Sequence, residues 1–260
     1  MVSSDSPSVL TVDCGNSRVK ASLFKGETLA GSTVMDTLSA LETSALWSGD
    51  AVPSGGILCC VGRNPKLSEV VSLADALAGQ LLILSHSTPL PVGICYDTPD
   101  TLGLDRIAGA CGAVSMFHGE SVLIADAGTA LTLDVVDGDA MFRGGNISPG
   151  VSLRLRALNG FTSALPLVAK EGRLHGFGRD TETAIRAGAV GGTADEIIAA
   201  AMRGQRDFGV TRLLLTGGDA RFLFPILSDY TSRITDFPEI RLCPDIVGRG
   251  LVSIFNYNRQ

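Results

Sequence analysis

The sequence predicts an α/β fold made of two related halves. Apolar runs that suit buried strands alternate with segments that suit helices, a pattern typical of α/β proteins rather than all-β ones. The same strand–turn–strand design occurs twice, over residues 9–24 and 122–136. Such a repeat indicates two related half-molecules that share a cleft. With 260 residues, 45% of them hydrophobic, the chain can bury the core of one large or two modest domains.

The copy at residues 122–136 has the more regular hairpin pattern. An apolar run reaches Asp126, Gly128 permits a tight turn, and Thr129 adds a hydroxyl at the tip. Period-two alternation then resumes, as a half-buried strand requires. A carboxylate at the end of a buried strand is costly unless a cation, a metal or a hydrogen-bond donor compensates it. The alternative is an Asx-type turn, in which Asp126 only caps its own backbone.

The earlier copy repeats the Asp-x-Gly turn between Asp13 and Lys20. Two such tips that face each other could clamp a polyphosphate, and the presence of both weakens the capping alternative. We expect a flexible tail over residues 1–8, an N-terminal half over 9–118 and a C-terminal half over 119–260.

The remaining elements follow from composition and periodicity. Before the second hairpin we expect a weak helix at 40–47, a buried strand at 55–61, a helix at 68–79, a strand at 80–84, a proline-rich loop at 85–100 and a helix at 101–117. After it we expect a glycine-rich loop at 143–150, a helix at 151–158, closely packed helices within 182–201, a strand at 211–215, a helix at 221–227 and a last helix at 245–257.

Three polar residues begin predicted helices. Asp105 and Arg106 are adjacent in the first turn of their helix, so they do not face each other and each needs another partner. Alternatively, Asp105 only complements the helix dipole and Arg106 is solvated. Thr181 either caps the helix that begins at Glu182 or contacts a ligand.

Charge and composition exclude several classes of protein. A net charge of −6 without a Lys and Arg cluster disfavours a nucleic-acid surface. We expect no membrane span, because no apolar run approaches the roughly 18 residues that one needs. The polar start is unlike a secretory signal, and six cysteines without a C-x-x-C pair suggest reduced thiols, so we expect a cytoplasmic protein. The P-loop and Rossmann glycine motifs are absent from the sequence.

Five motifs, in this order, resemble those of the type III pantothenate kinases: Asp13–Lys20, Gly103–Arg106, Asp126–Asp134, Gly144–Gly150 and Thr216–Ala220. The resemblance covers nearly the whole chain. It implies the fold of the acetate and sugar kinase, Hsp70 and actin superfamily, with duplicated ribonuclease-H-like (actin-like ATPase) domains around a central nucleotide cleft. It also implies ATP-dependent phosphorylation of pantothenate to phosphopantothenate, the first step of coenzyme A biosynthesis.

The resemblance also assigns roles by position. Asp105 matches the catalytic base, and Arg106 could pair with the pantothenate carboxylate. Tyr96, Gly103, Leu104 and Thr181 match other substrate-binding positions. Asp126 matches a monovalent-cation position, for potassium or ammonium, and magnesium is expected with ATP. The positions that match ATP-phosphate elements are Asp13, Cys14, Gly15, Asn16, Ser17, Arg18, Val19, Lys20 and Thr129.

The chain departs from the family pattern at two positions in the first turn. Ser17 stands where the family usually has Thr, which keeps the hydroxyl, and Cys14 stands where it usually has an aliphatic residue. The family is typically dimeric, so a homodimer is expected. Two alternatives stay open: a non-catalytic regulatory relative of the same fold, and a kinase or phosphohydrolase of the superfamily with another substrate.

Overall fold

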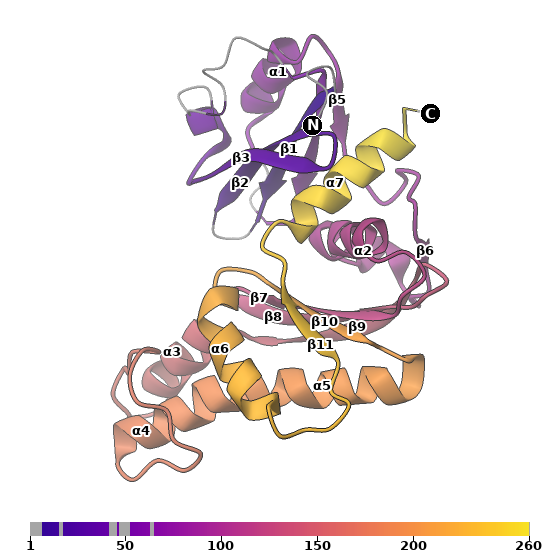
Figure 1. Cartoon of the computed structure of the whole chain (residues 1–260). Helices are drawn as coiled ribbons and strands as arrows, with labels where there is room; N and C mark the ends of the chain where they lie inside the picture. The colour runs from indigo at the N-terminus through magenta and orange to yellow at the C-terminus, as the bar shows by residue number, and fades with distance from the viewer. Residues whose placement is uncertain (1–6, 16–17, 42–45, 47–52, 63–64, 260) are drawn as a thin grey trace. The chain divides into compact units, whose positions relative to one another are not determined.

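The chain forms two compact units in the computed structural model, which describes residues 7–15, 18–41, 46, 53–62 and 65–259. The first unit contains Met1–His118 and Asp245–Gln260, and the second contains Gly119–Pro244 (Figure 1). The second unit therefore ends earlier than the half at 119–260 that the sequence suggested. The flexible tail expected at 1–8 lies mostly outside the described residues, and its last residue, Ser8, already belongs to a strand.

The first unit is a five-stranded mixed sheet with helices on both faces. The strand order is β3-β2-β1-β4-β5, and β1 pairs antiparallel with β2 and parallel with β4. The elements are β1 (Ser8–Cys14), β2 (Val19–Lys25), β3 (Thr28–Met35), the 3₁₀ helix η1 (Leu38–Leu41), β4 (Gly55–Cys60), α1 (Leu67–Ala76), β5 (Leu81–Ile83), β6 (Gly93–Ile94), the 3₁₀ helix η2 (Pro99–Thr101), α2 (Leu104–Met116) and α7 (Ile246–Tyr257).

Alternation along β1 separates two environments. Leu10, Val12 and Cys14 belong to an apolar cluster that also contains Leu73 of α1. On the opposite face, Thr11 lies against Gly248 of α7. Because side chains alternate along a strand, the Asp13 side chain belongs to the α7 face.

Helices α2 and α7 approach each other at two glycines. A Cβ atom on Gly250 would overlap the Ala108 carbonyl oxygen, and one on Gly112 would overlap the Ile246 carbonyl oxygen. The small residues of α2 therefore permit the close packing that the sequence suggested. This contact also explains why the last helix belongs to the first unit.

The second unit repeats the same topology. The strands that this unit contributes to its sheet lie in the order β11-β10-β7-β8-β9, with β7 antiparallel to β8 and parallel to β10. This arrangement matches β5-β4-β1-β2-β3 of the first unit strand for strand, which confirms the predicted duplication. The elements are β7 (Val122–Ala127), β8 (Ala130–Val136), β9 (Met141–Pro149), α3 (Val151–Phe161), α4 (Thr181–Arg186), the π-helical turn η3 (Ala187–Gly191), α5 (Gly192–Phe208), β10 (Arg212–Thr216), α6 (Ala220–Thr231) and β11 (Glu239–Leu242).

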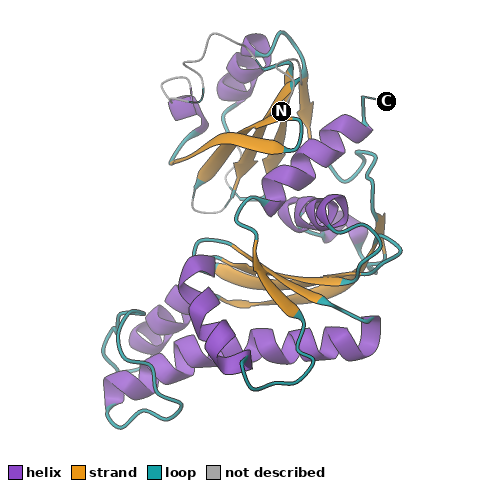
Figure 2. Cartoon of the chain, viewed as in Figure 1, coloured by secondary structure: helices purple, strands orange, loops and turns teal. Residues whose placement is uncertain are grey.

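The core of the second unit lies between its sheet and its helices. Helix α5 runs along the sheet (Figure 2) and buries Ile197 and Ala201 against Leu123 and Leu133 of the strands. Within the described part of the chain, every helix is too short or too polar to cross a membrane.

Several sequence predictions need correction. The segment 143–150 is not a loop but most of β9, because its backbone continues the ladder with β8 from Val136↔Phe142 to Ala130↔Pro149. Gly144, at φ +111°, lies where the register between β8 and β9 shifts, whereas the glycines and the proline of this segment favoured a loop. The weak helix expected at 40–47 is described only as η1 and Leu46, and its other residues lie outside the description. The sequence analysis missed the strands β3 and β11.

Replacing Gly250 with Ala should destabilise the first unit. The added methyl overlaps the Ala108 backbone, and overpacking of this kind typically costs about 1–3 kcal/mol of unfolding free energy. Gly160→Ala is the matched control, because Gly160 lies in α3 with open space around a new Cβ, and alanine there favours the helix. In urea denaturation, the midpoint of G250A should fall below that of wild type, whereas the midpoint of G160A should rise or stay unchanged. Equal stability of G250A and wild type would contradict the close packing of α2 on α7.

Candidate active site

The first unit brings Asp13 and Asp105 into the surroundings of one buried thiol. Cys59 of β4 is the register partner of Asp13 on β1 and is fully buried. Burial raises the pKa of the Cys59 thiol, and the negative charges of Asp13 and then Asp105 raise it further. The thiol is therefore neutral, and the two carboxylates singled out from the sequence lie within electrostatic reach of the same group. Sequence patterns did not indicate Cys59, because only the register of β1 and β4 places it there.

The start of α2 holds Asp105 in a defined orientation. Its Oδ1 accepts a hydrogen bond of 2.8 Å from the backbone N–H of Arg106. A Cβ atom on Gly103, the residue before the helix, would come within 2.5 Å of that oxygen, so a side chain there would displace the Asp105 carboxylate. A carboxylate at a helix N-terminus is stabilised by the helix dipole. Gly103, Asp105 and the first turn of α2 are therefore in direct contact with one another.

Arg106 has its partner in Tyr96. The guanidinium carbon lies 5.9 Å from the centre of the Tyr96 ring, and Arg106 is only 7% exposed. This cation–π contact is stronger for a desolvated cation, so the solvated alternative for Arg106 is wrong. His86 Nε2 lies 2.8 Å from the Leu102 carbonyl oxygen, which ties the proline-rich loop to the start of α2.

The turn of the first hairpin is described only at its ends. The N–H of Gly15 donates to the Arg18 carbonyl at 3.0 Å, and the N–H of Val61 donates to the Cys14 carbonyl at 3.1 Å. Lys20 is half-buried, whereas Arg18 is exposed. Asn16 and Ser17, both expected to contact ATP, lie outside the described residues.

In the second unit, three of the predicted motifs meet around Asp126. Thr216 of β10 is the register partner of Asp126, and a Cβ atom on Gly217 (φ +91°) would overlap Asp126 Oδ1. The N–H of Asp219 donates to the Ala127 carbonyl at 2.8 Å. A Cβ atom on Gly150 would overlap the backbone at the hairpin tip, and its N–H donates to the Thr129 carbonyl at 3.0 Å. The carboxyl ends of parallel strands are the common ligand positions of open α/β sheets.

Thr181 does not cap its helix. Asp180 is the N-cap, and its carboxylate accepts the Thr183 N–H at 2.8 Å, which lowers the pKa of Asp180. Thr181 is the first residue of α4 and is exposed. The predicted cap is therefore wrong by one residue, because Asp180 and not Thr181 has this role. Contact of Thr181 with a ligand stays a prediction.

Two basic residues that the sequence analysis missed hold the segment between α3 and α4. Arg186 is 9% exposed and donates from Nε to the Ala169 carbonyl at 3.1 Å. Lys170 forms an ion pair of 2.5 Å with Asp219 in the Thr216–Ala220 motif. Both contacts join positions far apart in the sequence, so no local pattern could have indicated them.

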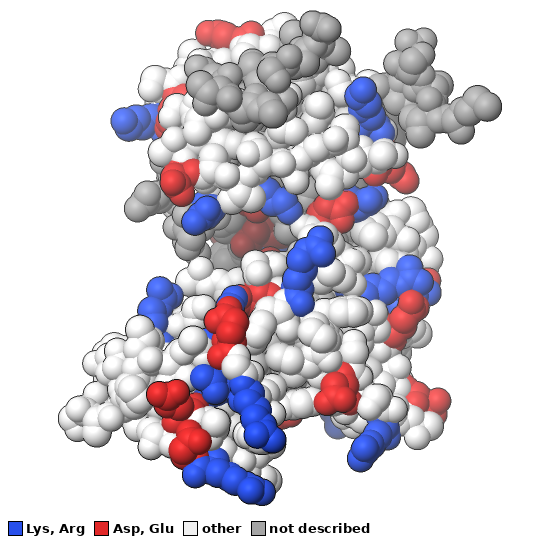
Figure 3. All heavy atoms as spheres, turned by 60° about the vertical axis from the view of Figure 1, so that its left-hand side comes forward, with Lys and Arg blue, Asp and Glu red and all other residues white. Residues whose placement is uncertain are grey.

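Other charged side chains of the second unit form ion pairs at its surface. Arg212 contacts Glu120 and Glu239, and Arg206 contacts Asp207. The face shown in Figure 3 accordingly has acidic and basic side chains interspersed. These are surface pairs, which contribute little individually to stability.

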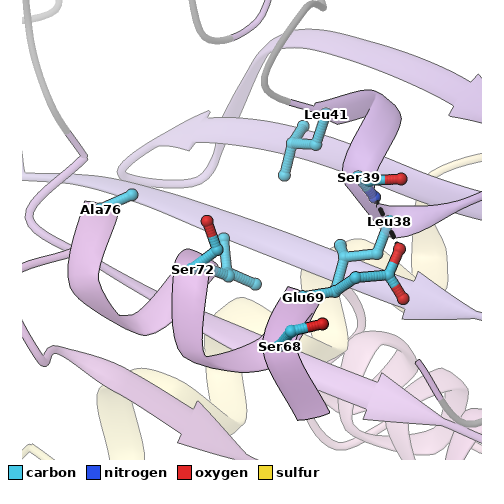
Figure 4. A pocket seen from close by; sticks show the side chains of 8 residues that line it. Leu38, Ser39, Leu41, Ser68, Glu69, Ser72 and Ala76 are labelled. Atoms are coloured by element: carbon cyan, nitrogen blue, oxygen red, sulfur yellow. Dashed lines mark hydrogen bonds between the residues drawn. The ribbon is translucent and has the colours of Figure 1, made fainter. Parts of the chain in front are cut away.

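A cavity of about 200 Å³ lies between η1 and α1 (Figure 4). Leu38, Leu41 and Leu73 give it an apolar lining, and Glu69 accepts the Ser39 N–H at 3.1 Å at its edge. It contains none of the residues that the motifs indicated. The described residues include no cluster of three or more His, Cys, Asp or Glu side chains that could hold a metal ion.

Comparison with known families gives a match over most of the chain. Residues 9–203 match the family model described as Type III pantothenate kinase. A relative of that name from Bacteroides fragilis is 38% identical over 256 residues, covering 96% of this chain and 98% of its own. Another from Porphyromonas gingivalis is 33% identical, with the same coverage of both chains.

Solved structures agree on the fold. A Baf family transcriptional activator from Campylobacter jejuni aligns with a TM-score of 0.61 at 20% identity, over 96% of this chain and 98% of its own. The activator of 2-hydroxyisocaproyl-CoA dehydratase from Clostridium difficile, solved with bound ADPNP, aligns with a TM-score of 0.53 at 16% identity, over 97% and 96%. At such identities the likeness shows the actin-like ATPase fold alone.

Proposed function

The chain belongs to the type III pantothenate kinase family, and from this premise we propose that Asp105 orients the pantothenate hydroxyl for phosphoryl transfer from ATP. The chain is a pantothenate kinase of an ATP-using family, and its reaction opens coenzyme A biosynthesis. We propose that this activity is cytoplasmic.

The orientation of the Asp105 carboxylate is the observation that carries this proposal. The Arg106 N–H holds one oxygen, Oδ1, at the N-terminus of α2. Phosphoryl transfer has a loose transition state, in which alignment of the attacking hydroxyl matters more than early removal of its proton. An ionised, fixed carboxylate is suited to accept a hydrogen bond from that hydroxyl and then its proton.

Arg106 is proposed to bind the substrate carboxylate. A guanidinium can form two parallel hydrogen bonds with a carboxylate, and its position over the Tyr96 ring reduces the number of orientations it adopts. Gly103, Leu104 and Thr181 are proposed as further substrate contacts on the basis of their motif positions.

The hairpin turns are proposed to contact ATP phosphates. Lys20 contributes a half-buried cation on β2, and a lysine ammonium can pair with a phosphate oxygen. Thr129 adds an exposed hydroxyl on the second hairpin. Asp13 to Lys20 in the first unit and Thr129 in the second are therefore each proposed to contact ATP phosphates, and magnesium bound to ATP would offset charge on the transferred group.

The surroundings of Asp126 suit a monovalent cation. Potassium takes oxygen ligands, including backbone carbonyls. Asp126 contributes a carboxylate at the close approach of Gly217, beside a turn with several backbone carbonyls. We propose that Asp126 holds potassium or ammonium, which would supply positive charge at the second hairpin turn.

Asp105→Asn should abolish most turnover while leaving the fold intact. Asparagine has nearly the same shape, but it cannot take up the proton of the hydroxyl. ADP release would be measured with ATP, magnesium, potassium and pantothenate. General-base contributions are commonly about 10²–10⁴-fold, so kcat should fall in that range.

Arg106→Lys is the contrasting variant. Loss of the two-point contact should raise KM for pantothenate more than it lowers kcat. Unchanged turnover in D105N would refute the proposed role of Asp105. No turnover by folded, ATP-binding wild type would favour the non-catalytic alternative, and turnover only with other hydroxyl compounds would favour a different substrate.

Potassium should stabilise the protein more than sodium does. Ligand that binds only the folded state raises the melting temperature, so the midpoint in potassium chloride should exceed that in sodium chloride at equal ionic strength. Asp126→Asn should remove this difference. Gly218→Ala is the control and should keep it, because a Cβ there meets open space. Equal midpoints for wild type in both salts would contradict the cation site.

We also propose that the chain forms a homodimer through the second unit. Phe161 is 91% exposed and Phe177 is 94% exposed, and Leu167 between them is also exposed. Large apolar side chains at a surface often mark an interaction site. Sedimentation velocity should find a wild-type dimer that Phe161→Ser with Phe177→Ser shifts toward monomer. A wild-type monomer at micromolar concentration would contradict the proposal.

A further inference from the structure

Two cysteines end neighbouring strands beside the first hairpin turn. Cys14 is the last residue of β1, Cys60 is the last residue of β4, and the two are register partners in the parallel ladder. Neighbouring strands lie about 4.8 Å apart, which is within the Cα separation of about 4.4–6.8 Å that disulfides span. Both residues are free thiols in this structure.

The two side chains share one face of the sheet. Cys14 is buried in the apolar cluster that includes Leu58 and Leu73, and Cys60 is partly buried against the same cluster. Cys59, the chain neighbour of Cys60, points to the opposite face, where Asp13 is its register partner. Only Cys60 can therefore meet Cys14 without a change of register.

The two thiols differ in chemistry and in access. A hydrogen bond between the two thiols lowers the pKa of Cys60, whereas this bond and burial raise the pKa of Cys14. Cys60 is half-buried and Cys14 is buried. A more acidic, more accessible thiol next to a buried one has the arrangement of an attacking and a resolving cysteine.

We propose that Cys14 and Cys60 form a reversible disulfide that lowers kinase activity when a low-molecular-weight disulfide oxidises the protein. Its effect on activity rests on the proposed function of the Asp13–Lys20 hairpin. Intracellular disulfides outside hyperthermophiles are mostly transient and sensing, which suits a bond between two strand ends near a ligand turn.

The exchange is balanced in two steps. The Cys60 thiolate attacks one sulfur of glutathione disulfide, forming a mixed disulfide and releasing one glutathione thiolate. Cys14 then loses its proton and attacks Cys60 Sγ, which releases the second glutathione. The two protein thiols lose two electrons in total, and glutathione disulfide gains them. Once Cys60 is in the mixed disulfide it carries no negative charge, so one cause of the raised pKa of Cys14 is removed.

The bond would act on the turn through the backbone of Cys14. Its carbonyl accepts the Val61 N–H, and it lies between Asp13 and Gly15. Disulfides require Cβ atoms about 3.5–4.5 Å apart, closer than most aligned strand neighbours hold them. Forming the bond therefore draws the ends of β1 and β4 together and displaces the backbone of the proposed phosphate turn.

The experiment combines a chemical readout with an activity readout. The full chain is incubated with glutathione disulfide, and free thiols are then alkylated. After tryptic digestion without reductant, mass spectrometry should detect a disulfide-linked pair of peptides. One is the peptide 1–18, which holds Cys14, and the other is the peptide 26–63, which holds Cys59 and Cys60. ADP release should fall in proportion to the linked fraction and return after dithiothreitol.

Three variants identify the partners. Cys60→Ser should lose the link and the activity response while it keeps basal turnover. Cys59→Ala should keep the link, because Cys59 lies on the other face, and Cys95→Ser should keep it because exposed Cys95 is not involved. Complete modification of exposed Cys95 by glutathione shows that the oxidant has reacted with the protein. Absence of the Cys14–Cys60 link under those conditions would overturn the proposal, as would a link that leaves turnover unchanged. Reduced protein without turnover would instead overturn the kinase role, since the link is read by mass alone.

Discussion

A carboxylate near the end of each central strand is the constraint on which both units depend. Asp13 of β1 and Asp126 of β7 occupy corresponding places in two sheets of the same topology. A charge beside a packed core is stable only when other groups compensate it. In the second unit, the Gly217 turn approaches Asp126 closely, which a side chain there would prevent. In the first unit, Cys59 stays neutral under the influence of Asp13 and Asp105.

Backbone proximity at glycines is the second recurring device. Gly112 and Gly250 bring α2 and α7 together, Gly150 lies against the second hairpin tip, and Gly103 makes room for the Asp105 carboxylate. At each position the absence of a side chain permits a contact between elements that carry motif residues. Close packing at α2 supports the helix whose first turn holds the proposed catalytic carboxylate.

The two faces of β1 separate the proposed chemistry from its proposed regulation. The Asp13 side of the strand meets Cys59 and the charge of Asp105, whereas the Cys14 side meets Cys60 and the apolar cluster around Leu73. One strand end thus connects the proposed phosphate turn to the thiol pair.

The sequence by itself determined the two hairpins, the α/β class, the duplication and the motif residues from Asp13 to Thr216–Ala220. These features depend on local periodicity and on short spacings, which the order of residues contains directly. Tertiary structure alone decided that β9 continues a sheet and that the last helix packs on α2. It also decided the partnerships of Cys14 with Cys60, Cys59 with Asp13, and Lys170 with Asp219. Each of these depends on strand register or close packing between distant segments, and local sequence carries no direct signal of either.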